Sequence, residues 1–189
     1  GDMSKFLTLA AMLIAASVPA LSQAADFNLT GGSGTTAKVT LASGGITLNV
    51  TGPSLGGALD VTRNATGVGV SVGLLDASGI GNGESLTLTF SQMVDLSSLR
   101  LADWDLVDKA TLTWSGGSAV LLGDGLISTD TETLTGAVGT VFTLTGNNTL
   151  TSFKLNGLTA VAAVPETSTY VMMALGLAGI GWAARRRQA

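Results

Sequence analysis

Apolar and polar residues alternate with a period of two over much of the chain, and this alternation restricts the fold more than any other feature. Successive side chains of a β-strand point to opposite faces of its sheet, so alternation is typical of strands that bury one face. Threonine fills many of the polar positions, which suits a solvated strand face. The alternating segments are 37–41, 46–50, 68–72, 86–90, 99–101, 112–114, 142–144 and 153–155.

Glycine-rich segments separate these predicted strands. Gly44 and Gly45 predict a tight hairpin turn between 37–41 and 46–50. Roughly nine or ten short strands predict an all-β fold, an antiparallel β-sandwich that is jelly-roll-like, with a barrel as the alternative. A β-solenoid competes with both, but the sequence shows no fixed repeat period. One helical turn is expected at 96–99.

The N-terminal segment, 1–24, has the regions of a signal peptide. Lys5 supplies a positive charge, residues 6–21 are mostly apolar, and residues 22–24 are small or polar. We expect signal peptidase to cleave between Ala24 and Ala25. Gly1 and Asp2 precede Met3 and are expected to be a cloning remnant. An uncleaved membrane anchor is the alternative to a signal peptide.

The C-terminal tail, 164–189, has three parts in order. A short polar motif comes first, an uncharged span at 170–184 follows, and an arginine cluster ends it: Val164, Pro165, Glu166 and Ser168, then Arg185, Arg186 and Arg187. Fifteen helical residues reach about 22 Å, less than the ~30 Å of a bilayer core. Flanking residues and long arginine side chains extend that reach.

This span predicts a transmembrane sorting helix with its arginines on the cytoplasmic side, so that the preceding residues lie outside the inner membrane. The alternative is a buried C-terminal helix of a globular domain. Such a helix should have a polar face, and this span has almost none. We therefore favour the membrane helix.

The three-part tail resembles the C-terminal sorting domain called PEP-CTERM, which is found on exported proteins of Gram-negative bacteria. The usual motif reads Val-Pro-Glu-Pro-Ser, and Thr167 stands here in place of the second proline. The resemblance implies that an exosortase removes the tail during export. It covers about 25 residues and implies nothing about the chemistry of the remainder.

A second, looser resemblance covers about 50 residues in the middle of the chain. Residues 67–70, residues 82–90 and the acidic stretch after them are similar to extracellular β-sandwich domains that often precede this tail. The resemblance supports a sandwich at 25–159. Residues 160–163 are expected to be a linker between the sandwich and the tail.

The composition of the expected mature segment, 25–164, excludes several classes of function. Five basic and eleven acidic residues give it a net charge of −6, which argues against nucleic acid as a partner. The chain has no cysteine and no histidine. Thiol catalysis, Ser-His-Asp triads and histidine zinc sites are therefore excluded, and no catalytic residue is predicted.

An acidic cluster, Asp103, Asp105 and Asp108, surrounds Trp104. Carboxylates at this spacing in a loop are candidate ligands for Ca²⁺, which binds six to eight oxygens. The spacing matches no known calcium loop. We therefore favour a solvated acidic turn with Trp104 turned inward, and expect no cofactor.

Two tryptophans lie in the expected mature segment. Trp104 is the candidate for glycan contact, because exposed aromatic faces stack on sugar rings. Trp114 follows Leu112 in an alternating strand. Packing in the core is the favoured interpretation of both, since large aromatic side chains dominate small cores.

Taken together, these features predict an exported, non-enzymatic protein of the cell surface or extracellular matrix. The family resemblance favours a role in biofilm, floc or exopolysaccharide-associated adhesion, with exopolysaccharide or self-association as the interaction. A carbohydrate-binding module is the first alternative. A glycan-active enzyme is the second, because eleven acids leave room for the carboxylate pair that such an enzyme needs.

Overall fold

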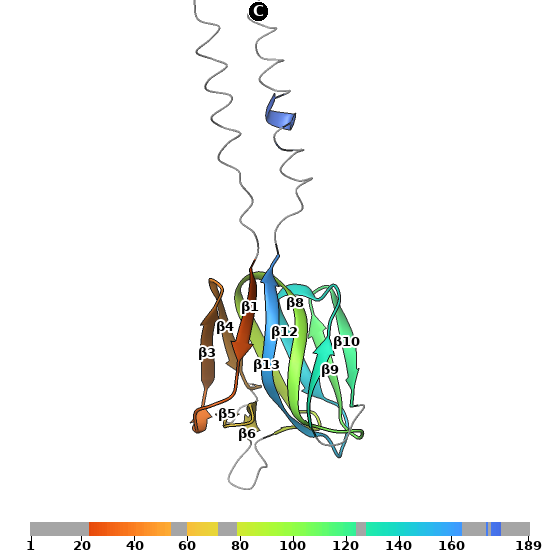
Figure 1. Cartoon of the computed structure of the whole chain (residues 1–189). Coiled ribbons are helices and arrows are strands. Elements are labelled where there is room, and N and C mark those ends of the chain that lie inside the picture. Colours follow the sequence, from red (N-terminus) through yellow and green to blue (C-terminus); the bar gives the residue numbers. More distant parts are fainter. Residues whose placement is uncertain are drawn as a thin grey trace, which may run out of the picture.

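The computed structural model describes residues 23–53, 60–71, 79–123 and 128–163, together with Met173 and residues 175–178. Its strands are β1 (Ala24–Asn28), β2 (Gly34–Thr36), β3 (Lys38–Ser43), β4 (Ile46–Thr51), β5 (Asp60–Arg63), β6 (Val68–Ser71), β7 (Ile80–Gly81), β8 (Ser85–Trp104), β9 (Lys109–Trp114), β10 (Gly117–Leu122), β11 (Ser128–Thr133), β12 (Val138–Gly146) and β13 (Ser152–Ala162). Neighbouring strands pair antiparallel, as Figure 1 shows, which confirms the predicted all-β sandwich.

The 20-residue strand β8 belongs to both layers of the sandwich. Its first part, 85–90, lies between β4 and β12, which continue through β3 on one side and through β9 and β10 on the other. Its last part, 94–104, lies between β13 and β11. Residues 91–93 are exposed and interrupt the alternation, so the strand passes there from the first layer to the second.

The core lies between the two layers. Phe27 of β1 contacts Phe90 of β8 edge to face with ring centroids 6.0 Å apart, and Phe90 contacts Phe142 of β12 in the same way at 5.7 Å. Most described apolar positions of the predicted alternating strands are buried, including Leu86 and Leu88, whereas Leu41 and Trp114 are half-buried and Ala37 is exposed. Full burial of such side chains contributes about 1.5–3 kcal/mol each, so the alternation itself accounts for most of the stabilising contacts.

The hairpin predicted around Gly44 and Gly45 is present. These two glycines join β3 to β4, and their φ angles are +54° and +77°. Positive φ at both central residues is the geometry of a two-residue turn that follows the twist of the strands, and glycine adopts it without strain.

Two predictions about local structure are wrong. Residues 96–99 form no helical turn, because they lie within β8 and bury Leu96 and Leu99. Residues 160–162 are not a linker, because β13 continues to Ala162. Ala160 is fully buried, and it pairs with Ala25 of β1 on one side and with Leu96 of β8 on the other. This alanine is therefore part of the sheet, with a strand on each side.

The two ends of the domain lie side by side. β1 runs antiparallel to β13, with Ala24 opposite Val161. The chain therefore enters and leaves the sandwich at the same pole, at the top of Figure 1.

Candidate functional site

The three aspartates around Trp104 serve different structural purposes. The backbone N–H of Asp105 donates to Asp108 Oδ2 at 2.8 Å, and that of Val107 donates to Asp105 Oδ1 at 2.9 Å. Asp103 has a φ of +58° and forms an ion pair with Lys154. Asp105 and Asp108 thus close a turn between β8 and β9, while Asp103 binds a lysine of β13.

This arrangement does not produce the calcium site considered for Asp103, Asp105 and Asp108. In the described part of the chain, no group of three or more acidic side chains could hold a metal ion. The favoured alternative, a solvated acidic turn, is wrong for Asp108, which is 4 % exposed. Its carboxylate is directed inward because it accepts backbone hydrogen bonds.

Burial also changes the acidity of Asp108. Desolvation is the main cause that raises the pKa of its carboxyl above the ordinary value of 3.8, and the nearby charges of Asp105 and Asp103 act in the same direction. Hydrogen bonds from the backbone of Asp105 and Ser152 oppose this shift by stabilising the charged form. Burial of the carboxyl therefore accounts for the raised pKa of Asp108, whose hydrogen bonds hold the backbone at Asp105 and Ser152.

Trp104 is not a glycan contact. Its side chain is only 1 % exposed, and its ring lies edge to face against Phe153 with centroids 4.8 Å apart. The favoured interpretation, core packing, is confirmed for this residue. Its indole Nε1 is buried, and no hydrogen-bond acceptor reaches it among the described residues.

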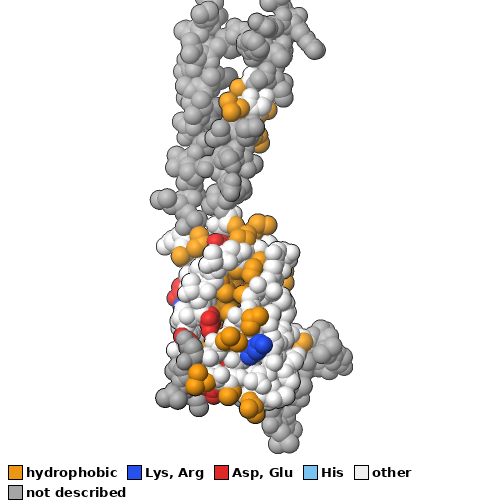
Figure 2. All heavy atoms as spheres, turned by 90° about the vertical axis from the view of Figure 1, so that its right-hand side faces the viewer, with side chains coloured by type: hydrophobic (Ala, Val, Ile, Leu, Met, Phe, Trp, Pro, Cys, Tyr) orange, Lys and Arg blue, Asp and Glu red, His pale blue; other side chains and the backbone are white. Residues whose placement is uncertain are grey.

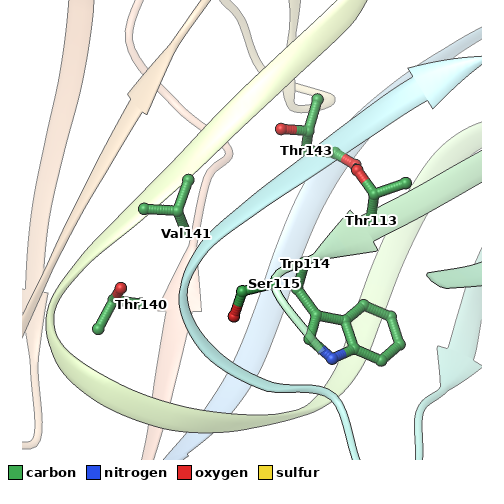
Figure 3. Close-up of a pocket in the computed structure, with 6 residues that line it drawn as sticks. All are labelled: Thr113, Trp114, Ser115, Thr140, Val141 and Thr143. Atoms are coloured by element: carbon green, nitrogen blue, oxygen red, sulfur yellow. The ribbon is translucent and has the colours of Figure 1, made fainter. Parts of the chain in front are cut away.

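Trp114 lines a shallow groove instead of lying wholly in the core. The groove has a volume of about 350 Å³, and Figure 3 shows the residues that line it, from β9, the turn after it and β12: Thr113, Trp114, Ser115, Thr140, Val141 and Thr143. The Trp114 ring also packs on Phe142, with centroids 6.2 Å apart. Core packing is therefore correct for one part of the Trp114 side chain, which contacts Phe142, while another part lines the groove.

Two glycines leave one side of the Trp114 indole uncovered. A Cβ at Gly116 would lie 3.3 Å from Nε1, and one at Gly117 would lie 3.2 Å from Cζ2. A side chain at either position would cover the ring. The signal in the sequence is the run Trp114-Ser115-Gly116-Gly117, in which two glycines directly follow an aromatic residue and a serine.

Hydroxyl side chains form rows across the outer face of the first layer. Because paired residues share a face, the strand registers define these rows directly. The longest row crosses β10, β9, β12, β8 and β4, and its residues are Ser118, Thr113, Thr143, Thr87 and Thr51. A second row crosses β9, β12 and β8, and its residues are Thr111, Thr145 and Ser85. Neighbours within a row are about 4.8 Å apart, and the rows are about 7 Å apart. The threonine grid, as we call these eight residues, carries no charge.

The predicted processing sites lie mainly outside the described residues. This is so for the sorting motif residues Val164, Pro165, Glu166 and Ser168, and for Arg185, Arg186 and Arg187. Of the predicted cleavage pair, Ala24 is exposed at the start of β1 and Ala25 is buried. Met173 and residues 175–178 are helical, and no helix within the described ranges is both long and apolar enough to cross a membrane.

Comparison with known proteins identifies the tail. The fold and the chain end together define an all-β domain followed by a C-terminal sorting signal. A family model for the PEP-CTERM protein-sorting motif matches residues 163–187, which confirms the resemblance noted in the sequence. The protein therefore carries the sorting signal of an exported protein that an exosortase processes. A search of curated proteins found no match.

Proposed function

We propose that the domain acts outside the inner membrane as a matrix protein, through non-enzymatic association with exopolysaccharide in biofilm or floc formation. The threonine grid is the observation that carries this proposal. An uncharged, regularly spaced set of hydroxyls on a sheet face can exchange hydrogen bonds with a neutral polymer of repeating hydroxyls. Export by the PEP-CTERM route supports it, because it delivers the domain to the envelope.

Deletion of the gene tests this function. The deletion strain should lose cell aggregation or matrix retention, and the wild-type gene should restore it, while the chain length of soluble polysaccharide stays unchanged. A shift in polysaccharide length that depends on a specific carboxylate pair would instead establish a glycan-active enzyme and refute the proposal.

A carbohydrate-binding module is a second candidate function, favoured by the groove at Trp114. The groove brings the Trp114 indole together with the hydroxyls of Ser115 and Thr140, so an apolar ring and hydroxyl partners line one hollow. Binding of the exported protein to a glycan array should then fall with Trp114→Leu and with the Ser115→Ala, Thr140→Ala double variant. Unchanged binding by both variants would place the glycan elsewhere.

A further inference from the structure

Strand β10 forms an open edge of the first layer. Within the described ranges, β9 is the only strand paired with it. One side of an edge strand exposes backbone N–H and C=O groups that can pair with another strand. Residues 117–122 read Gly-Ser-Ala-Val-Leu-Leu, with no proline to remove a donor.

The edge at β10 lacks the charges found on the other outer strands of comparable length. Soluble proteins block edge pairing with charged side chains, among other devices. Of the other outer strands, β11 carries Asp130 and Glu132, β1 carries Asp26 and β3 carries Lys38. β2 and β7 are also uncharged, but they have only three and two residues, and very short edge strands are themselves protected from pairing. β10 has six residues and none is charged. Two copies of an acidic domain can therefore approach through β10 without like charges meeting along the strand.

An apolar patch adjoins this edge. Val120 and Leu122 point away from the core and are 58 % and 59 % exposed, and Leu106 is 64 % exposed in the turn before β9. The backbone N–H of Gly123 donates to Asp108 O at 3.1 Å, which holds the end of β10 against that turn. Figure 2 faces this side of the molecule and shows hydrophobic side chains gathered on it.

We infer that two copies of this chain associate by antiparallel pairing of their β10 strands, which joins the first layers into one continuous sheet. This rests on the matrix role proposed above, to which it adds a second copy of the chain as a partner beside exopolysaccharide, although the pairing can be tested without that role. A second copy fits better than an acidic or basic partner, because the strand is neutral and offers no charge to complement.

The two faces of β10 restrict the register. Ala119 and Leu121 face the core side, while Ser118, Val120 and Leu122 face outward. Residues directly opposite each other in an antiparallel pair have their side chains on the same face of the sheet. In a symmetric pair of two β10 strands, the two-fold axis must therefore pass beside one residue, which lies opposite itself, and not between two neighbouring residues. Ala119 and Val120 are the two centres that pair five residues of each strand, and only Val120 brings both exposed apolar residues, Val120 and Leu122, into the pair. This centre places Val120 opposite its own counterpart, Ser118 opposite Leu122 of the second copy and Ala119 opposite Leu121.

A single engineered cysteine tests this geometry, because the chain contains no cysteine of its own. In the full chain within its native envelope, Val120→Cys should form a disulfide-linked dimer under mild oxidation, since directly paired Cα atoms lie about 4.5–5.5 Å apart. Leu122→Cys is the register control. Its counterpart would lie about 14 Å away, beyond disulfide range. Val141→Cys, exposed on the same face two strands further in, is the surface control.

A non-reducing gel should show a dimer band for Val120→Cys that is several-fold stronger than for either control. Equal bands in all three variants would indicate random collision and overturn the inference. Sedimentation of the detergent-solubilised chain gives a second measurement: wild type should be a dimer, and Val120→Lys a monomer. A monomeric wild type would also overturn it. A dimer whose loss leaves cell aggregation unchanged would refute the matrix role and leave the pairing intact.

Discussion

The Asp108 carboxylate accepts a hydrogen bond from the backbone N–H of Ser152, with Oδ1 and N 3.1 Å apart. This bond joins the turn before β9 to the first residue of β13, 44 positions later in the chain. The backbone N–H of Lys109 donates to Thr151 Oγ1 at 3.2 Å beside it. The aspartate cluster is therefore part of the framework that joins the two layers at the end of the sandwich opposite to the one where the chain enters and leaves.

Asp108→Ala should lower the free energy of unfolding by about 2–4 kcal/mol, because it leaves the backbone N–H groups of Asp105 and Ser152 without their acceptor. Urea unfolding followed by circular dichroism measures this. Asp26→Ala is the control. Asp26 pairs with Arg100 on the surface, at 63 % side-chain exposure, so its loss should cost less than about 1 kcal/mol. Equal effects would contradict the assigned role of Asp108.

The pH dependence of stability should carry the signature of Asp108. Burial raises the pKa of this carboxyl in the folded state, so the unfolded chain releases the proton first as pH rises. The stability of wild type relative to Asp108→Asn should therefore decrease from the ordinary pKa upward and become constant above the raised value. Urea unfolding of both proteins from about pH 3 to pH 7 tests the sign. A relative stability that increases with pH would mean that the hydrogen bonds outweigh desolvation.

Two glycines of β12 should respond differently to alanine. A Cβ at Gly146 would lie 2.3 Å from the backbone oxygen of Gly81, whereas one at Gly139 would make only ordinary contacts, the nearest at 3.5 Å. Gly146→Ala should lower stability by about 1–3 kcal/mol, because backbone must shift to make room. Gly139→Ala should stay within about 1 kcal/mol of wild type. Thermal unfolding of both variants makes the comparison, and a tolerated Gly146→Ala would contradict the close approach.

Removal of divalent metal should leave the fold unchanged. Asp103, Asp105 and Asp108 have a lysine or backbone N–H groups as partners. Thermal unfolding with EDTA and with added Ca²⁺ should therefore give the same midpoint. A midpoint raised by Ca²⁺ and lowered by EDTA would restore the calcium hypothesis.

Exosortase processing should depend on Pro165 and Glu166 of the matched motif. Replacing both by alanine should leave the tail attached and hold the protein in the inner membrane. Mass spectrometry of the protein from membrane and released fractions detects the tail. A Thr167→Ala variant is the control, since Thr167 already departs from the usual motif. Release of the double variant at the wild-type level would show that this motif does not direct processing.

The local sequence pattern was sufficient to predict most strands and the Gly44–Gly45 turn, because both depend on residues that are neighbours in the chain. It could not predict that β8 continues from Phe90 into the second layer. A run such as Ser91-Gln92-Met93, all exposed, looks the same at a strand end and at a passage between layers. Ala160 looked like linker because alanine has low strand propensity, yet pairing on both sides determines its structure.

At the candidate site, too, local sequence pattern could not predict which tryptophan and aspartate side chains are buried. Trp104 and Trp114 are the last residues of β8 and β9, and only the neighbours supplied by distant segments decide which ring is covered. The sequence favoured a solvated acidic turn at Asp105 and Asp108. The burial of Asp108 arises from Ser152, and the lysine that binds Asp103 lies 51 positions away.

The place of β13 determines how the domain can bear force. Until an exosortase removes the sorting tail, tension on the tail reaches the domain at the end of β13, the last strand before it. β1 is paired along one side of β13 and β8 along the other. Sliding β13 out would strain the hydrogen bonds of both ladders together, whereas peeling an edge strand breaks them one after another. The end of β13 therefore resists tension in shear while the tail still holds the protein at the membrane.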